Sequence, residues 1–240
     1  METVINLILA GVMLICVWSG YKKGIIMGVG GILAIIVSLY GANLLAVTFS
    51  PDIIPAIRPF ASGFMESQIK AEGGVIERMG WSGAELSVSD LIAKYPEREM
   101  EFCSVCYQTL GLDETTSDNM AAVTMEYILE SGASTVDGVT QTLCEKIGYV
   151  GCFILAFLLI VIILTVIGNL PNLSYKLPNL DALNDIGGSL LGVCTGILFC
   201  MVIVWSLKFT GKIIGSNTLS SAWLASIFLD HNLLTQYLGL

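Results

Sequence analysis

Charged residues are scarce in this sequence, and four long stretches contain none. Only 13% of the residues are charged, and a single histidine is present. The uncharged stretches are apolar runs at about 4–19, 24–47, 149–168 and 187–207. Runs of about 20 apolar residues can cross the hydrocarbon core of a bilayer. With a hydrophobic fraction of 55% and a mean hydropathy of +0.79, the composition indicates an integral membrane protein.

These shortages also exclude several functions. Ion-coupled carriers mark their path with ionisable side chains inside the membrane, and these spans offer none. The net charge of −9 argues against nucleic-acid binding, which needs a basic surface. No nucleophile elbow, P-loop, dinucleotide fingerprint or HExxH motif occurs, and the polar part of the chain lacks four ligands for zinc. We therefore expect no enzyme, and no catalytic, cofactor-binding or metal-binding residues.

The distribution of charge divides the chain into four parts. Residues 1–49 are expected to form a hairpin of two spans joined by a loop of about four residues, and residues 146–207 a second hairpin. Between them, the insert 50–145 is acidic, with about three acidic residues for each Lys or Arg from Pro51 to Cys144. Residues 208–240 are expected to form an apolar or interfacial tail helix. The predicted fold is all-α: a four-helix membrane bundle with a mostly helical insert.

Local signals set the expected ends of several helices. Pro51, Pro55 and Pro59 are expected to end the second span, because proline removes a backbone donor and clashes with the preceding turn. In the insert, Ser89 and Ser117 precede segments with helical spacing of apolar residues and are the expected caps.

The lysines give an orientation. Lys22 and Lys23 follow the first span and place the first loop in the cytoplasm, so that both termini and the insert lie outside. Lys176 agrees with this arrangement, whereas Lys208 and Lys212 count against it.

Glycines recur every four residues at two places and form a strip on one face of a helix. Gly188, Gly192 and Gly196 begin the last span. The set Gly20, Gly24 and Gly28 surrounds the first turn. Small residues at this spacing let two helix backbones approach closely, which is how helices associate in lipid. These six glycines are the predicted helix-packing residues.

Cys103 and Cys106 form the sharpest chemical motif of the insert, a C-x-x-C pair. One interpretation is a redox pair that passes electrons to a quinone. The others are a structural disulfide, or two ordinary thiols one helical turn apart. A lone C-x-x-C without a thioredoxin-like context is weak evidence for redox chemistry.

Three stretches resemble the CvpA family, the colicin V production proteins of bacterial inner membranes. They are the basic turn GYKKGII from Gly20, the glycine-rich segment LDALNDIGGSLLGVCTG from Leu180, and WLAS from Trp223. The resemblance covers the two hairpins and not the insert. It implies a plasma-membrane protein required for production and export of a peptide toxin, with links to envelope integrity and no catalytic residues.

The main functional hypothesis is a non-enzymatic inner-membrane protein. It would support toxin export and envelope homeostasis through helix packing with copies of itself or with envelope or export proteins. A small channel or uncoupled transporter, with a path between the hairpins, is the alternative. A membrane thiol oxidoreductase that uses Cys103 and Cys106 is the third hypothesis.

Overall fold

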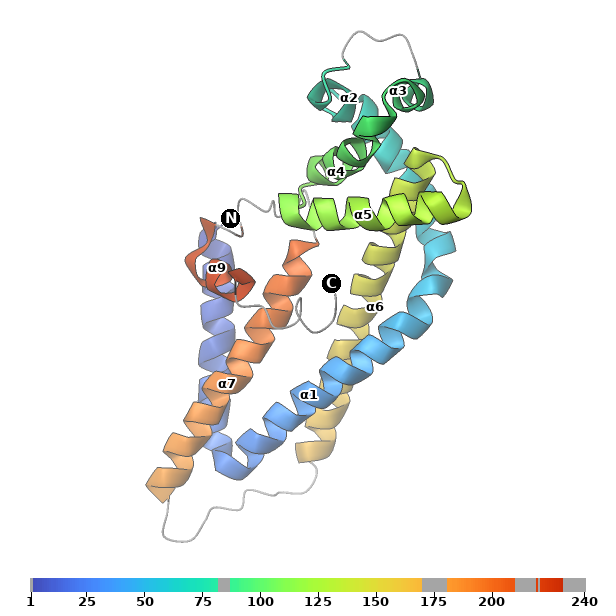
Figure 1. Cartoon of the computed structure of the whole chain (residues 1–240). Helices are drawn as coiled ribbons and strands as arrows, with labels where there is room; N and C mark the ends of the chain where they lie inside the picture. Colours follow the sequence, from blue (N-terminus) through green and yellow to red (C-terminus); the bar gives the residue numbers. More distant parts are fainter. Residues whose placement is uncertain (1, 82–86, 170–180, 210–218, 220, 231–240) are drawn as a thin grey trace. The chain divides into compact units, whose positions relative to one another are not determined.

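The computed structural model describes residues 2–81, 87–169, 181–209, 219 and 221–230, and every regular element in these ranges is a helix (Figure 1). The elements are α1 (Glu2–Lys70), α2 (Val75–Arg78), α3 (Val88–Lys94), the 3-10 helix η1 (Pro96–Arg98), α4 (Glu99–Thr109), α5 (Glu114–Ser131), α6 (Thr135–Asn169), α7 (Asp181–Lys208) and α9 (Trp223–Asp230). The all-α prediction is therefore confirmed. Helices α1, α6 and α7 are long and apolar enough to cross a membrane.

Helix α1 is broken at one residue. Gly24 has φ 75° and ψ −177°, and it divides α1 into a first arm, residues 2–23, and a second arm, residues 25–70. The chain turns sharply there (Figure 1). The expected loop of about four residues is thus wrong, because Gly20 to Lys23 remain helical and glycine alone makes the turn.

The prolines do not end the second arm, which continues to Lys70, so that expectation is also wrong. Pro51, Pro55 and Pro59 are all exposed and are spaced four residues apart. Each removes one donor from the same exposed side of the helix, where the freed carbonyl groups can be solvated. The helix tolerates the prolines for that reason.

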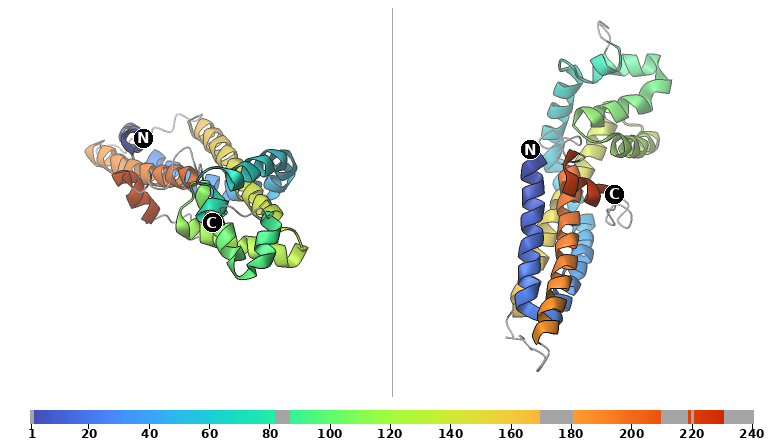
Figure 2. Two further views of the ribbon diagram at one scale, coloured as in Figure 1. Left: turned by 90° about the horizontal axis from the view of Figure 1, so that it is seen from above. Right: turned by 90° about the vertical axis from the view of Figure 1, so that its left-hand side faces the viewer.

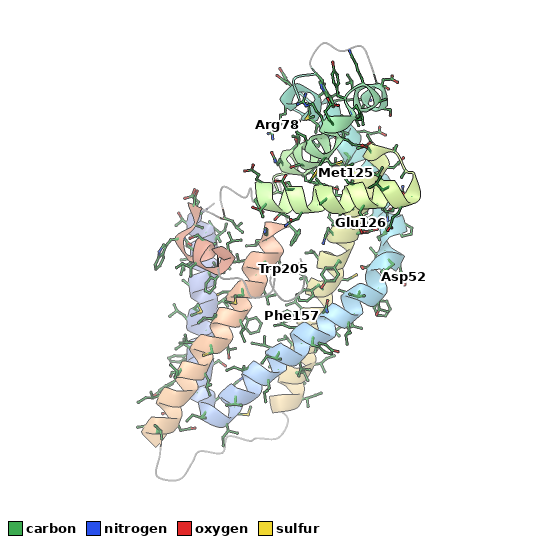
Figure 3. The ribbon with its side chains drawn as sticks, in the orientation of Figure 1. Asp52, Arg78, Met125, Glu126, Phe157 and Trp205 are labelled. Atoms are coloured by element: carbon green, nitrogen blue, oxygen red, sulfur yellow. The ribbon has the colours of Figure 1, made fainter. Side chains whose placement is uncertain are left out.

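The chain forms two compact units. The first, called the apolar unit, contains α1 up to Thr48, α6 from Val150, α7 and α9. Within it, aromatic rings join α6 to α7: Phe153 meets Trp205 edge-on at 5.0 Å between centroids, and Phe157 meets Phe199 at 6.0 Å. Figure 3 labels Phe157 and Trp205 on these two helices.

The second unit, called the insert unit, contains Phe49–Tyr149 and has its own hydrophobic core. At its centre the Tyr107 hydroxyl lies 2.6 Å from Thr124 Oγ1 and 3.3 Å from the Val139 carbonyl oxygen. Three different helices, α4, α5 and α6, are tied together by these bonds.

The caps of the insert helices differ from those expected. Ser87 caps α3 through a reciprocal capping box with Asp90, and Asp113 caps α5 by accepting from the Thr116 amide. Ser89 and Ser117 instead lie inside these helices. Both helices begin earlier because a better cap, with an extended backbone, stands upstream.

Some expectations concern residues outside the described ranges. They are the loop with Pro171, Lys176 and Pro178, the lysine at 212, and the tail after Asp230.

Candidate helix-packing interface

The turn at Gly24 requires glycine for two independent reasons. Its φ of 75° is in the left-handed region, which residues other than glycine adopt only with strain. A Cβ at this position would also lie 2.6 Å from Oδ1 of Asn184, which belongs to α7. A side chain at this position would therefore strain the backbone and displace the Asn184 amide group.

Asn184 completes the turn by capping the second arm. The arm restarts at Ile25, and the first amides of a helix have no partner within it. The Ile25 amide donates to Asn184 Oδ1 at 3.0 Å, and Asn184 is only 3% exposed. A side chain of α7 thus acts as the cap that the chain of α1 cannot supply.

The first arm and α7 then run antiparallel with their backbones in contact, side by side in Figures 1 and 2. A Cβ at Gly192 would lie 2.5 Å from the Cys16 carbonyl oxygen and 3.0 Å from Val17 Cα. One at Gly20 would lie 2.9 Å from Gly192 Cα, and one at Gly188 would lie 2.8 Å from Gly24 Cα. Only glycine permits this approach, because backbone atoms cannot move aside as a side chain can.

The outer glycines make softer contacts. A Cβ at Gly28 would lie 2.9 Å from Leu191 Cβ, and one at Gly196 would lie 2.8 Å from Met13 Sδ. Met13 Sδ can move when its side chain changes rotamer, whereas Leu191 Cβ is fixed by its backbone and moves only if α7 shifts. The structure therefore brings together all six glycines predicted for packing, and it makes Gly20, Gly188 and Gly192 the least replaceable along with Gly24.

Hydroxyl groups contribute little across this interface. Ser189 Oγ donates to the Asp185 carbonyl and Thr195 Oγ1 to the Leu191 carbonyl, both within α7 and both at 2.9 Å. The contact between the described parts of α1 and α7 depends instead on close backbone packing, on the Asn184 cap and on the Cys200 thiol, which donates to the Leu9 carbonyl oxygen at 3.7 Å.

A second asparagine, Asn6, binds the helix α9 near the C-terminal end of the described residues. Asn6 Oδ1, near the start of α1, accepts from the Leu224 amide in the first turn of α9 at 3.1 Å. Ala222 and Ala225 are buried, whereas Trp223 is exposed. The short helix α9 is thereby fixed to the first arm, at the end opposite Gly24.

The C-x-x-C pair lies elsewhere, in α4 of the insert unit. Cys103 and Cys106 are both free thiols and fully buried. Burial raises the pKa of Cys103 to about 12, and burial also raises the pKa of Cys106. A reactive thiol needs a lowered pKa and access, so the surroundings here favour packing over redox chemistry.

Sequence reasoning missed Asn184, although a signal was present. Extending the four-residue spacing of Gly188, Gly192 and Gly196 backwards by one step reaches position 184. The same extension from Gly20 reaches Cys16, whose carbonyl oxygen meets Gly192. The contact face therefore extends beyond the glycines, to Asn184 on α7 and to Cys16 on the first arm.

Comparison with known proteins supports the family resemblance. A family model described as "Colicin V production protein" matches residues 122–232, which include all of α6, α7 and α9. No curated protein and no solved structure matches the chain. The match contains the α7 side of the interface, with Asn184, Gly188, Gly192 and Gly196. It does not contain the first arm of α1. Over residues 122–232 this chain is thus similar to the colicin V production protein family.

Proposed function

We propose that the chain is a non-enzymatic, four-span protein of the bacterial inner membrane that supports peptide-toxin export and envelope homeostasis. The two arms of α1 would be the first two spans, and α6 and α7 the others. The observation that carries this proposal is the backbone contact of the first arm with α7, built on Gly20, Gly188 and Gly192. Such a contact stabilises helix association in lipid, where burying apolar area does not hold helices together.

The surface that the interface leaves open suits partners in the membrane. In the most apolar windows of α1, α6 and α7, only 22%, 17% and 39% of the residues are buried. On α6 the side chains of Leu155 and Ile162 are 70% and 60% exposed. Because the glycine strips are already used within the chain, we assign contacts with copies of itself or with export proteins to α6.

The first turn supports the proposed orientation, with the insert and both termini outside. Lys22 and Lys23 stand at the end of the first arm, and the Lys22 ammonium lies 5.0 Å from the ring centroid of Trp18. Trp18 and Tyr21 are exposed beside them. Aromatic and basic side chains together are typical of a membrane–water boundary on the cytoplasmic side.

The proposal is tested with a deletion strain exposed to a bile-salt detergent and, separately, made to secrete a colicin V-type toxin. Wild-type protein is expected to restore survival in the detergent and the zone of growth inhibition that the secreted toxin produces. Gly192→Leu is expected to restore neither, because its side chain would collide with the backbone of Cys16 and Val17. The matched control is Gly30→Leu, at an exposed position with no atom within 4 Å of its Cβ. Full rescue by Gly192→Leu at equal protein levels would refute the role of packing.

The alternatives make different predictions. A channel or uncoupled transporter would produce solute flux in liposomes that contain the purified protein alone, whereas our proposal predicts tight liposomes. A thiol oxidoreductase would lose its function in Cys103→Ala. We expect that variant to rescue the deletion strain, because both thiols are buried in the insert core.

A further inference from the structure

The apolar unit contains a cavity of about 190 Å³ between both arms of α1, α6 and α7. Apolar side chains and glycines form most of its wall, among them Gly31, Ala34 and Phe199. The hydroxyl of Thr195, which also lines it, is already bonded within α7. The cavity thus offers a mainly hydrocarbon-like interior.

The charged group of the cavity wall is Lys23, next to the turn at Gly24. Lys22 precedes it in the chain and lies over the Trp18 ring. Among the described residues, the ion pairs within 4.0 Å join Arg58 to Asp137 and Arg98 to Glu101. Neither Lys22 nor Lys23 therefore has a carboxylate of these residues within that distance. The Lys23 ammonium therefore lies at an apolar space, and Lys22 adds a second positive charge next to it in the chain. An apolar space with positive charge at its edge is the pattern that an anionic amphiphile requires.

We propose that this cavity binds one acyl chain of an anionic phospholipid, whose phosphate is held by Lys23 and Lys22. The proposal rests on the membrane location of the apolar unit. A cavity of about 150 Å³ lined by apolar side chains admits benzene, so 190 Å³ accepts a short length of one chain. A helix of a second copy, about 10 Å wide, cannot enter it. The two lysines select a negatively charged headgroup over a zwitterionic one.

Gly31 gives a direct test. A Cβ there would meet only Thr195 Oγ1, at 4.0 Å, so Gly31→Leu fills the cavity and leaves the contact of the first arm with α7 intact. Gly30→Leu adds the same side chain one residue earlier, outside the cavity wall. The full chain is purified in detergent, mixed with phosphatidylglycerol or phosphatidylcholine of equal chain length, and weighed intact by native mass spectrometry.

Wild type and Gly30→Leu are expected to retain one phosphatidylglycerol in preference to phosphatidylcholine. In Gly31→Leu, retention should fall about tenfold or more, because displacing even two methylene groups has that effect. Should Gly31→Leu not fold, as judged by gel filtration, Ala34→Leu replaces it.

The double variant Lys22→Gln, Lys23→Gln tests the headgroup separately. It should retain the two lipids equally, because the cavity is intact and the charges are gone. Equal retention of phosphatidylglycerol by Gly31→Leu and Gly30→Leu would overturn the proposal, and so would equal retention of the two lipids by wild type. Gly192 also lines the cavity, so the lipid test uses Gly31→Leu, which leaves the helix contact intact. Failure of the lipid test would therefore leave helix packing as the explanation of the Gly192→Leu phenotype, and the two proposals can be told apart.

Discussion

Replacing Gly192 by alanine is the most direct test of the interface between the first arm of α1 and α7. The added Cβ would lie 2.5 Å from the Cys16 carbonyl oxygen, whereas ordinary contacts begin at 3.4 Å. The two backbones must therefore move apart by about 0.9 Å, the difference between these distances. A gap of that size forfeits a quarter to a half of the dispersion energy of each contact along the interface.

The expected cost follows from this displacement. Overpacking of a well-packed site costs about 1–3 kcal/mol. Alanine also gains up to about 1 kcal/mol over glycine in helix propensity, which would mask part of the loss. Gly30→Ala measures that gain alone, because nothing lies within 4 Å of its Cβ. We expect Gly192→Ala to be less stable than Gly30→Ala by about 1–3 kcal/mol.

The assay is reversible unfolding of the purified protein in mixed micelles with increasing sodium dodecyl sulfate, followed by tryptophan fluorescence and far-ultraviolet circular dichroism. Trp205, buried in the apolar unit, reports the loss of its packing. Equal unfolding midpoints for Gly192→Ala and Gly30→Ala would refute the argument, because they would show that the two helices are not in backbone contact at this position.

Three further predictions concern polar groups. Asn184→Ala leaves the partly buried Ile25 amide without its acceptor, so it should lower the unfolding free energy by about 1–2 kcal/mol and speed hydrogen exchange at Ile25. Ser189→Ala, on the same helix, should change neither, and slow exchange at Ile25 in Asn184→Ala would contradict the capping role. Tyr107→Phe should destabilise the insert unit by about 1 kcal/mol, measured by thermal unfolding, and an unchanged midpoint would argue against the hydroxyl bonds. Because the Cys103 thiol has its pKa raised from 9.0 to about 12, its contribution to stability is complete below pH 9 and is lost as the pH rises from 9 towards 12. Cys103→Ala should show a flatter decline in unfolding free energy over that range, and an equal decline in both proteins would refute the assignment.

The long apolar helices could be predicted because length and hydrophobicity decide them almost alone. The apolar run at 149–168 lies within α6, and 187–207 lies within α7. The prolines misled the prediction because their effect depends on whether the freed carbonyl groups face solvent. Sequence spacing places Pro51, Pro55 and Pro59 on one side of a helix, but only the fold shows that this side is exposed.

The close helix contacts of the six glycines could be predicted from their spacing, whereas the helix they contact could not. A strip with a period of four predicts a face for close contact and says nothing about what occupies it. The structure assigns the strip around Gly188 to the first arm of the same chain. Asn184 was missed because an amide near the start of a helix is typical of an ordinary cap for its own helix. Its hydrogen bond crosses 159 residues of sequence.

The turn at Gly24 and the cap from Asn184 depend on each other. A helix that breaks at Gly24 exposes the amide of Ile25, and in an apolar environment an unpaired amide is costly enough to disfavour the break. Asn184 removes that cost only if α7 approaches Gly24 closely, and this approach needs Gly20, Gly188 and Gly192 to be free of side chains. The basic turn and the glycine-rich start of α7 are therefore one structural device. A change in either should disturb the other, and Asn184→Ala combined with Gly192→Ala should cost less than the sum of the two separate losses, because each variant already opens the same contact.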